Sequence, residues 1–204
     1  LIFYTLITTV LASFAFARIN FKGKNILFSI LLATMMIPGE MMIITNYQTA
    51  LTWNMANTYS SLIFVHGVSV FYIFYLRQTF QQIPNELYLA SKVDGYGTFS
   101  YLWKVMIPIA MPTIISIAIL SLMGAWNSYV WPNLIASGEN PIFGNSMKLV
   151  SNGLMDMFTN SLTGESNDTA KMAAALLVTI PLFIFFLIFR KKIMSGVSRS
   201  GIKG

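Results

Sequence analysis

The sequence predicts an all-α polytopic membrane protein, and its composition is the first reason. Hydrophobic residues make up 55% of its 204 residues and charged residues 10%. The mean hydropathy is +0.65, whereas soluble domains carry roughly a quarter of charged residues. The second reason is that the apolar residues form five stretches, each close to the ~20 residues with which a helix crosses a bilayer. These stretches are Leu1–Ala17, Asn25–Thr45, Tyr59–Leu76, Val105–Trp126 and Met172–Phe189.

Two of the stretches carry unusual features. Leu1–Ala17 has no basic residue before it and runs into Arg18 instead of a small-residue cleavage site, so we expect a span and not a signal peptide. The sequence begins without Met, which predicts that the chain lacks an N-terminal part. Within Val105–Trp126, Pro108 and Pro112 each remove a backbone donor. Membrane helices tolerate this when neighbouring groups satisfy the freed carbonyls.

The charged residues between the stretches predict the orientation of the chain. Lys and Arg are retained on the cytoplasmic side, and the four loops and the tail hold 3, 0, 3, 2 and 5 of them in order. We therefore expect residues 18–24, residues 77–104 and the C-terminus to be cytoplasmic. The net charge of +6 then reflects topology and not a nucleic-acid partner. Five spans and a cytoplasmic C-terminus place residue 1 outside, so a sixth span is expected upstream.

The composition gives little support to metal, redox or acid–base chemistry. The chain has no cysteine and one histidine, which excludes a disulfide framework and a multi-histidine metal site within it. We expect His66 to pack between helices or line a pore, and Glu40 to serve structure or topology near the outer end of its span. A membrane enzyme would need facing acids, histidines or cysteines. A secondary transporter would need internal repeats and ionisable residues at mid-membrane. The sequence shows neither repeats nor such residues.

The loop of residues 77–104 is expected to contain a short polar helix outside the membrane. Pro84 suits a first helical turn, Asn85 or a residue beside it is a candidate cap, and Glu86 lies favourably at the positive end of the helix. Gly95 supplies a stop. An apolar stripe is expected along this helix, formed by Ile83, Leu87, Ala90 and Val93. The pattern alone fits both an interfacial helix that anchors the loop to headgroups and a helix that docks on a partner.

The same loop resembles a motif of a known family. Residues 84–95, PNELYLASKVDG, and residues 107–112, IPIAMP, resemble the cytoplasmic EAA loop of ABC importer permeases. The family form is approximately P-x-E-L-x-E-A-A-x-x-D-G, followed by L-P-x-x-x-P. Alignment on Asp94 and Gly95 places Leu89 on the family glutamate, which is a departure from the pattern.

The resemblance implies that this helix couples the membrane spans to an ATPase. Ala90 and Ser91 fall on the two family alanines, and Glu86 matches an earlier glutamate of the extended pattern. The implied coupling residues are Glu86, Leu89, Ala90, Ser91, Asp94 and Gly95.

Four further segments narrow the resemblance to carbohydrate importers of the maltose type. Residues 16–25, FARINFKGKN, resemble an A-F-A-R-x-x-F-x-G-K turn, and residues 36–40, MIPGE, resemble an M-x-P-x-E pattern. Residues 125–135, AWNSYVWPNLI, resemble W-N-x-x-x-x-P-L. Residues 195–204, SGVSRSGIKG, resemble the terminus of the second, smaller permease subunit. Residues 1–204 are therefore interpreted as one N-terminally incomplete transmembrane domain of an ABC importer.

The resemblance implies a division of labour among subunits. Two non-identical permeases would form the pathway, two cytoplasmic ATPase subunits would drive it, and an extracytoplasmic binding protein would deliver a sugar or oligosaccharide. This chain would be a transport subunit of the bacterial cytoplasmic membrane and not an enzyme, since it contains no GxxxxGK[ST] sequence. It would need no cofactor of its own, because ATP and Mg²⁺ would bind the ATPase. The identity of the solute stays open, with a polyol, glycerol phosphate or an amino acid as the alternative.

Side chains near the outer end of the Val105–Trp126 stretch are candidates for contact with the solute. Sugars stack on aromatic faces and hydrogen-bond to amides, which makes Trp126, Asn127 and Tyr129 possible residues of the substrate path. Aromatic residues are also expected at membrane interfaces for structural reasons, so both interpretations stay open. Residues 147–157 are expected to form an amphipathic helix at the outer face, where the binding protein of the family docks.

Overall fold

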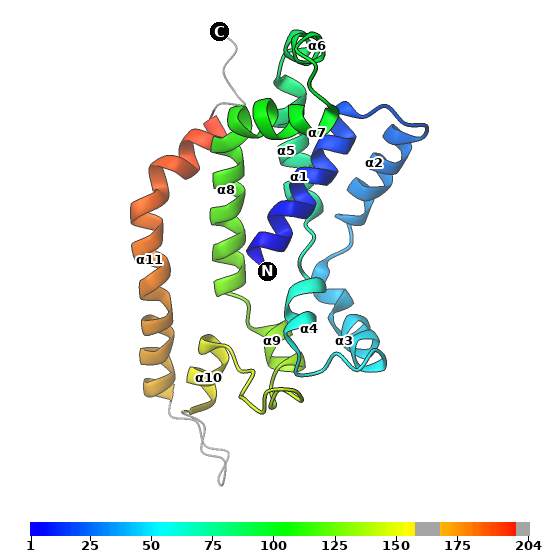
Figure 1. Ribbon diagram of the computed structural model, residues 1–204. Coiled ribbons are helices and arrows are strands. Elements are labelled where there is room, and N and C mark those ends of the chain that lie inside the picture. Colours follow the sequence, from blue (N-terminus) through cyan, green and yellow to red (C-terminus); the bar gives the residue numbers. More distant parts are fainter. Residues whose placement is uncertain (158–167, 199–204) are drawn as a thin grey trace. The chain divides into compact units, whose positions relative to one another are not determined.

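Helices form nearly all of the regular structure in the computed structural model, which describes residues 1–157 and 168–198. Within these ranges, the strand-like pairing is one antiparallel bridge between Glu139 and Ser146. The end of the SGVSRSGIKG segment, which includes Arg199 and Lys203, lies outside the described residues. The described chain is therefore all-helical, as predicted (Figure 1).

The elements follow in chain order (Figure 1). They are α1 (Ile2–Arg18), α2 (Lys24–Thr34), the 3-10 helix η1 (Gly39–Met42), α3 (Ile43–Thr52), α4 (Tyr59–Phe64), α5 (Val70–Gln82), α6 (Asn85–Val93), α7 (Thr98–Tyr101), the π-helical turn η2 (Leu102–Met106), α8 (Ile107–Trp126), α9 (Val130–Ile135), α10 (Val150–Met157) and α11 (Asp168–Ser198). Contacts divide the chain into two compact units. One holds residue 1, Gly39–Gly67 and Leu122–Arg190, and the other holds Ile2–Pro38, Val68–Ser121 and the residues from Lys191.

The unit that holds α1, α2, α5 and α6 is built around the packing of α1 against α5. The Ser13 hydroxyl is buried in this contact and donates to the Ile73 carbonyl oxygen at 2.9 Å. Small polar residues allow helices to approach closely in a membrane, where no hydrophobic effect drives them together. The core of this unit consists of Phe14, Leu76, Phe80, Ile83, Tyr101, Leu102, Met106, Ala110 and Ile117.

The other unit has a smaller core around Trp131 of α9. The Trp131 indole Nε1 is buried and donates to the Ser61 carbonyl oxygen at 3.1 Å, as a buried tryptophan requires. Nearby, Asn57 has a φ of 53° and its Oδ1 accepts from the Gly138 backbone N–H at 2.8 Å. The buried residues of this core are Ala50, Trp131, Ile135, Ala136 and Met147.

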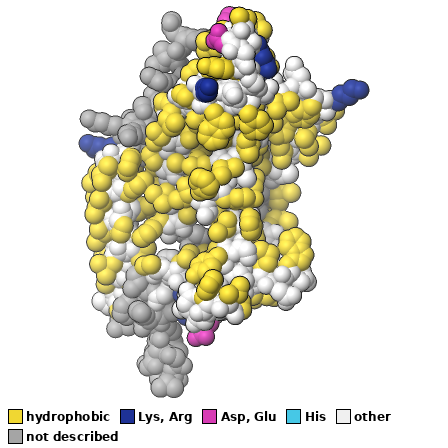
Figure 2. Space-filling model, in the orientation of Figure 1, with side chains coloured by type: hydrophobic (Ala, Val, Ile, Leu, Met, Phe, Trp, Pro, Cys, Tyr) yellow, Lys and Arg dark blue, Asp and Glu magenta, His cyan; other side chains and the backbone are white. Residues whose placement is uncertain are grey.

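Two of the five predicted spans are continuous helices of sufficient length. Thr98–Trp126 runs for 29 residues through α7, η2 and α8, and Asp168–Arg190 of α11 runs for 23 residues; both are apolar enough to cross a membrane. Large apolar side chains along α11, such as Met172 and Leu176, are exposed. Hydrophobic side chains cover most of the face in view in Figure 2. The membrane class of the fold therefore follows from the structure as well as from the sequence.

The other predicted spans differ from continuous transmembrane helices. Asn25–Thr45 is broken between α2 and η1, where Pro38 cannot continue a helix. The helix predicted over Tyr59–Leu76 is wrong as one element, because Val65–Ser69 separates α4 from α5. Ser69 then caps α5 by accepting from the Tyr72 backbone N–H at 3.4 Å. At 17 residues, α1 is apolar but shorter than the two long helices.

The wide turn η2 stands directly before Pro108. Its last hydrogen bond joins the Ile107 N–H to the Leu102 carbonyl oxygen, five residues back. A proline ring clashes with the carbonyl four residues before it, here that of Lys104, and a π turn relieves such crowding at the cost of regular geometry. From η2 onward the helix is continuous, with Pro112 inside it.

Candidate coupling helix and translocation-path residues

The end of α6 has the backbone geometry that the D-G pair predicts. Gly95 has a φ of 78°, in the left-handed region. The Tyr96 N–H donates to the Ser91 carbonyl oxygen at 2.8 Å, and the Gly95 N–H donates to the Lys92 carbonyl oxygen at 3.1 Å. These two bonds form a Schellman motif, which satisfies the last carbonyls of a helix and reverses the chain. The stop predicted at Gly95 is confirmed.

The start of α6 differs from the sequence prediction. Asn85 does not cap the helix, because the residue at the cap position is Pro84 and no side chain accepts there. Instead, the Asn85 Oδ1 accepts from the Arg18 guanidinium at 3.3 Å. The same guanidinium donates to the Phe80 carbonyl oxygen at 3.1 Å and to the Ile83 carbonyl oxygen. Arg18 therefore ties the end of α1 to the end of α5 and to the start of α6.

The role of Arg18 was missed in the sequence, although the residue stands inside the FARINFKGKN segment. Lys and Arg in that loop were read as a topology signal, and the acceptors of Arg18 lie more than 60 residues away in the chain. Only Arg presents a planar fork that can serve several oxygens at once. The one local indication of this role is the position of Arg18 at the end of a helix, where the last backbone carbonyls have no partner within the helix.

The residues of the predicted apolar stripe differ in burial. Ile83 is buried in the core below the helix, whereas Leu87, Ala90 and Val93 are exposed. Ser91 is instead the buried residue, with 3% of its surface exposed. Apart from Ile83, the predicted stripe thus lies on an exposed side of α6, and Ser91 lies on the buried side.

One aromatic pair packs α6 on the rest of its unit. The Tyr88 and Tyr101 rings meet edge to face, with centroids 5.1 Å apart. The Ser91 hydroxyl donates to the Tyr88 carbonyl oxygen at 2.7 Å, and the Lys92 ammonium lies 5.3 Å from the centre of the Tyr88 ring. The buried face of α6 thus contains Tyr88 and Ser91, and its other side is free for contact with a partner.

The predicted coupling residues therefore separate into two groups. Ser91 lies inside, against the unit that carries it, and Gly95 shapes the backbone. The others are exposed on α6 and directly after it: Glu86, Leu89, Ala90 and Asp94. Leu89, at 57% exposed, and Val93, at 89% exposed, lie one helical turn apart and form an apolar pair on this surface.

The predicted substrate-path residues lie together in sequence, but their side chains have different surroundings. The Trp126 indole Nε1 donates to the Val178 carbonyl oxygen of α11 at 2.9 Å. Asn127 and Tyr129 are exposed, and the Tyr129 carbonyl oxygen accepts from the Asn152 side-chain amide at 3.0 Å. The donor of Trp126 thus joins two helices, which is a structural use of the residue.

A pocket of about 280 Å³ lies beside these residues in the same unit. It is lined mainly by apolar side chains, together with Tyr59, His66, Ser128 and Trp131. The His66 and Trp131 rings pack with centroids 5.1 Å apart, in agreement with the packing role predicted for His66. None of Trp126, Asn127 and Tyr129 lines this pocket.

Acidic and histidine side chains do not cluster in the part of the chain that the structure describes. No group of three or more His, Cys, Asp or Glu residues there could hold a metal ion. The described residues instead include an exposed side of α6 and aromatic and amide side chains that pack near α9.

Comparison with known proteins agrees with this arrangement. The chain is 28% identical over 200 residues to the arabinooligosaccharides transport system permease protein AraQ of Halalkalibacterium halodurans, covering 98% of this chain and 68% of that protein. It is 26% identical over 189 residues to the sn-glycerol-3-phosphate transport system permease protein UgpE of Yersinia enterocolitica, covering 93% of this chain and 65% of that protein. The chain thus spans about two thirds of the length of these relatives.

A solved structure has the same fold. It is the crystal structure of a bacterial ABC transporter involved in the import of the acidic polysaccharide alginate. One chain of that structure superposes with a TM-score of 0.75 at 23% identity, over 93% of this chain and 69% of that chain. At sequence level, residues 7–199 match the family described as binding-protein-dependent transport system inner membrane component. The match covers nearly the whole sequence, and the chain belongs to this family of inner-membrane transport components.

Proposed function

We propose that this chain is a permease subunit of an ATP-driven, binding-protein-dependent importer for a sugar or oligosaccharide. The observation that carries the proposal is an exposed helix with a Gly95 stop in a chain that matches the family along residues 7–199. The arabinooligosaccharide permeases among its relatives support a saccharide as the solute.

The helix α6 is proposed to dock on a separate ATPase subunit. Its exposed side carries Glu86, Ala90 and Asp94 beside the apolar pair of Leu89 and Val93, and its base is held by Arg18 and by the contact of Tyr88 with Tyr101. A helix fixed at its base transmits a push as a rigid body. ATP and Mg²⁺ would bind the ATPase, and this chain would contribute no catalytic residue and hold no cofactor of its own.

The rest of the assembly follows from the same proposal. A second, non-identical permease subunit would complete the pathway, two ATPase subunits would drive it, and an extracytoplasmic sugar-binding protein would deliver the solute. Residues 18–24, residues 77–104 and the C-terminus would be cytoplasmic, with five spans in this chain. Trp126, Asn127 and Tyr129 would lie near the outer end of the path, and all three are exposed.

The test is the capture of solutes by the binding protein of the same transport system. Calorimetric titration with a panel of mono- and oligosaccharides, a polyol and sn-glycerol 3-phosphate identifies the ligand. Stimulation of ATP hydrolysis by the loaded binding protein then tests transport competence of the assembled importer. We expect an oligosaccharide both to bind and to stimulate hydrolysis.

A second candidate solute has a specific observation in its favour. Relatives named sn-glycerol-3-phosphate permeases match over 93% of this chain at 25–26% identity. If sn-glycerol 3-phosphate binds and stimulates ATP hydrolysis while every saccharide fails, the second candidate replaces the first.

A further inference from the structure

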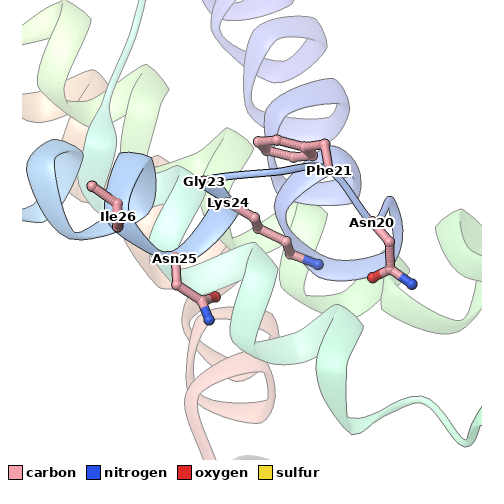
Figure 3. Close-up of a pocket in the computed structure, with 6 residues that line it drawn as sticks. All are labelled: Asn20, Phe21, Gly23, Lys24, Asn25 and Ile26. Atoms are coloured by element: carbon pink, nitrogen blue, oxygen red, sulfur yellow. The ribbon is translucent and has the colours of Figure 1, made fainter.

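The segment between α1 and α2, together with the start of α2, forms a pocket that none of the predicted coupling or substrate-path residues lines. This pocket has a volume of about 480 Å³ and is lined by Asn20, Phe21, Gly23, Lys24, Asn25 and Ile26. Figure 3 shows the polar side chains of Asn20, Lys24 and Asn25 pointing to one side of the segment, with the Phe21 ring and the Ile26 side chain on the other. One ammonium group and two amides are therefore among the groups that line this pocket.

Positive charge around this pocket is not balanced by nearby acids. Within Ile2–Pro38 and Val68–Ser121 of this unit there are six basic residues, Arg18, Lys22, Lys24, Arg77, Lys92 and Lys104, and two acids, Glu86 and Asp94. The charges that act on Lys24 are those of Arg77 and Arg18, and neither acid is among them. The basic side chains use neutral oxygens as acceptors. The Lys24 ammonium donates to the Ala17 carbonyl oxygen at 3.3 Å, and the Arg77 Nε donates to the Phe16 carbonyl oxygen at 3.2 Å.

The cations also repel one another. Partial burial lowers the pKa of the Lys24 ammonium, and the nearby positive charges of Arg77 and Arg18 lower this pKa further. The Arg77 guanidinium is itself held in place, because it lies 4.0 Å from the centre of the Phe28 ring. An anion in the pocket would relieve this repulsion, since attraction between opposite charges at short range is worth several times its value in bulk water.

The surface next to the pocket is apolar. Ile26 is 69% exposed and Ile30 is 57% exposed on α2, one helical turn apart, and Leu27 and Phe21 are also exposed. A group of cations bordered by an exposed apolar helix face matches a molecule with an anionic head and a hydrocarbon tail. Because α2 begins the predicted span Asn25–Thr45, acyl chains are the hydrocarbon available to cover this face.

We propose that the Asn20–Ile26 pocket binds the phosphate headgroup of an anionic phospholipid, with one acyl chain lying along Ile26 and Ile30 of α2. The chain belongs to an inner-membrane family, and this loop is the first of the basic, cytoplasmic loops predicted from the sequence. Cytoplasmic leaflets carry anionic lipids that attract basic segments. The Lys24 ammonium binds the phosphate, and the amides of Asn20 and Asn25 donate to its oxygens.

The test is native mass spectrometry of the full-length subunit in its assembled importer, titrated separately with phosphatidylglycerol and phosphatidylcholine. We expect phosphatidylglycerol to bind more tightly. Lys24→Met should weaken phosphatidylglycerol binding about five-fold, or about 1 kcal/mol, and leave phosphatidylcholine binding unchanged. Lys22→Met is the matched control: it removes the same charge from an exposed position of the same loop that does not line the pocket, and it should change binding less than two-fold, about 0.4 kcal/mol.

Two further variants guard against a trivial loss of folding. Lys24→Arg should retain phosphatidylglycerol binding, and Asn25→Asp should weaken it at least as much as Lys24→Met, because it adds a negative charge at nearly constant shape. Equal losses in Lys22→Met and Lys24→Met would overturn the proposal in favour of diffuse electrostatic attraction. Displacement of phosphatidylglycerol by millimolar inorganic phosphate would overturn it in favour of a soluble-anion site.

Discussion

Two single residues with special geometry hold α6 on the unit that carries it. Arg18 makes contacts to three acceptors on two elements that lie more than 60 residues away in sequence. Gly95 adopts a backbone angle that L-residues avoid. Both act on α6, one at its start and one at its end, so α6 is fixed by two residues that do not lie within it.

Replacing Arg18 by lysine should destabilise the protein although the charge is kept. A lysine ammonium carries its three N–H donors on one nitrogen, whereas the guanidinium reaches Asn85 from one nitrogen and Phe80 and Ile83 from another. We expect a loss of about 1–2 kcal/mol, close to one charge-assisted hydrogen bond, measured as a lower thermal unfolding midpoint in lipid nanodiscs. Arg190→Lys is the matched control, since Arg190 is exposed. Equal midpoints for the two variants would show that Arg18 is only a topology signal.

At the scale of elements, α6 presents a mixed surface that ends in a fixed turn. A Cβ at Gly95 would meet no atom within 4 Å, and the same holds for Gly97. The two glycines differ in backbone angle, because Gly95 has a φ of 78° and Gly97 a φ of −68°. They therefore form a pair in which backbone strain can be tested without steric contact.

Gly95→Val should release the ATPase while leaving the subunit inserted in the membrane. The left-handed conformation costs a residue with a Cβ about 1–2 kcal/mol, so helix α6 would lose its stop and its docking angle. We expect the amount of ATPase that co-purifies to fall about 5- to 30-fold. Gly97→Val needs no unusual backbone angle and should bind the ATPase as the parent does. Equal co-purification in both variants would make α6 an interfacial anchor.

Leu89→Glu should weaken the ATPase contact even though it restores the family residue. Leu89 lies beside Val93 on the exposed side of α6, and we expect this apolar pair to fill an apolar socket, where a carboxylate would lose its hydration. A loss of about tenfold in affinity, or about 1.4 kcal/mol, is expected by interferometry with the purified ATPase. Gln81→Glu adds the same charge at an exposed site outside α6 and should have little effect. If Leu89→Glu strengthens binding, the socket is polar.

Much of the order of the helices could be predicted, because apolar composition and residues such as glycine determine the structure of the segment in which they stand. The long apolar runs of α8 and α11 and the Gly95 stop need no distant partner. The breaks at Pro38 and at Val65–Ser69 were missed because an average over a whole span hides a single proline or glycine. The rotation of α6 could not be predicted, since Arg18 and Tyr101 fix it from far away in the chain. The contact between Trp126 and α11 was missed for the same reason.

At the scale of the whole molecule, the alternation of basic residues among the loops predicts which loops are cytoplasmic. The positions of the helices do not test this orientation. The chain has no cysteine, so single cysteines can be introduced without a background. Cysteine at Lys22 or Lys203 should react with a membrane-impermeant reagent only after permeabilisation, and cysteine at Glu139 should react in intact cells. Lys203 lies outside the described residues, so for it the experiment alone decides. Labelling of Lys22→Cys in intact cells would reverse the predicted topology.

The most direct test of the central claim is uptake of radiolabelled oligosaccharide into proteoliposomes that contain the assembled importer. The chain is interpreted as a pathway subunit driven through α6 by a separate ATPase. Uptake should therefore require enclosed ATP, the binding protein and this subunit together, and Gly95→Val should reduce it far more than Gly97→Val. Uptake that proceeds without ATP when a proton or sodium gradient is imposed, and that is equal in the two glycine variants, would contradict the account.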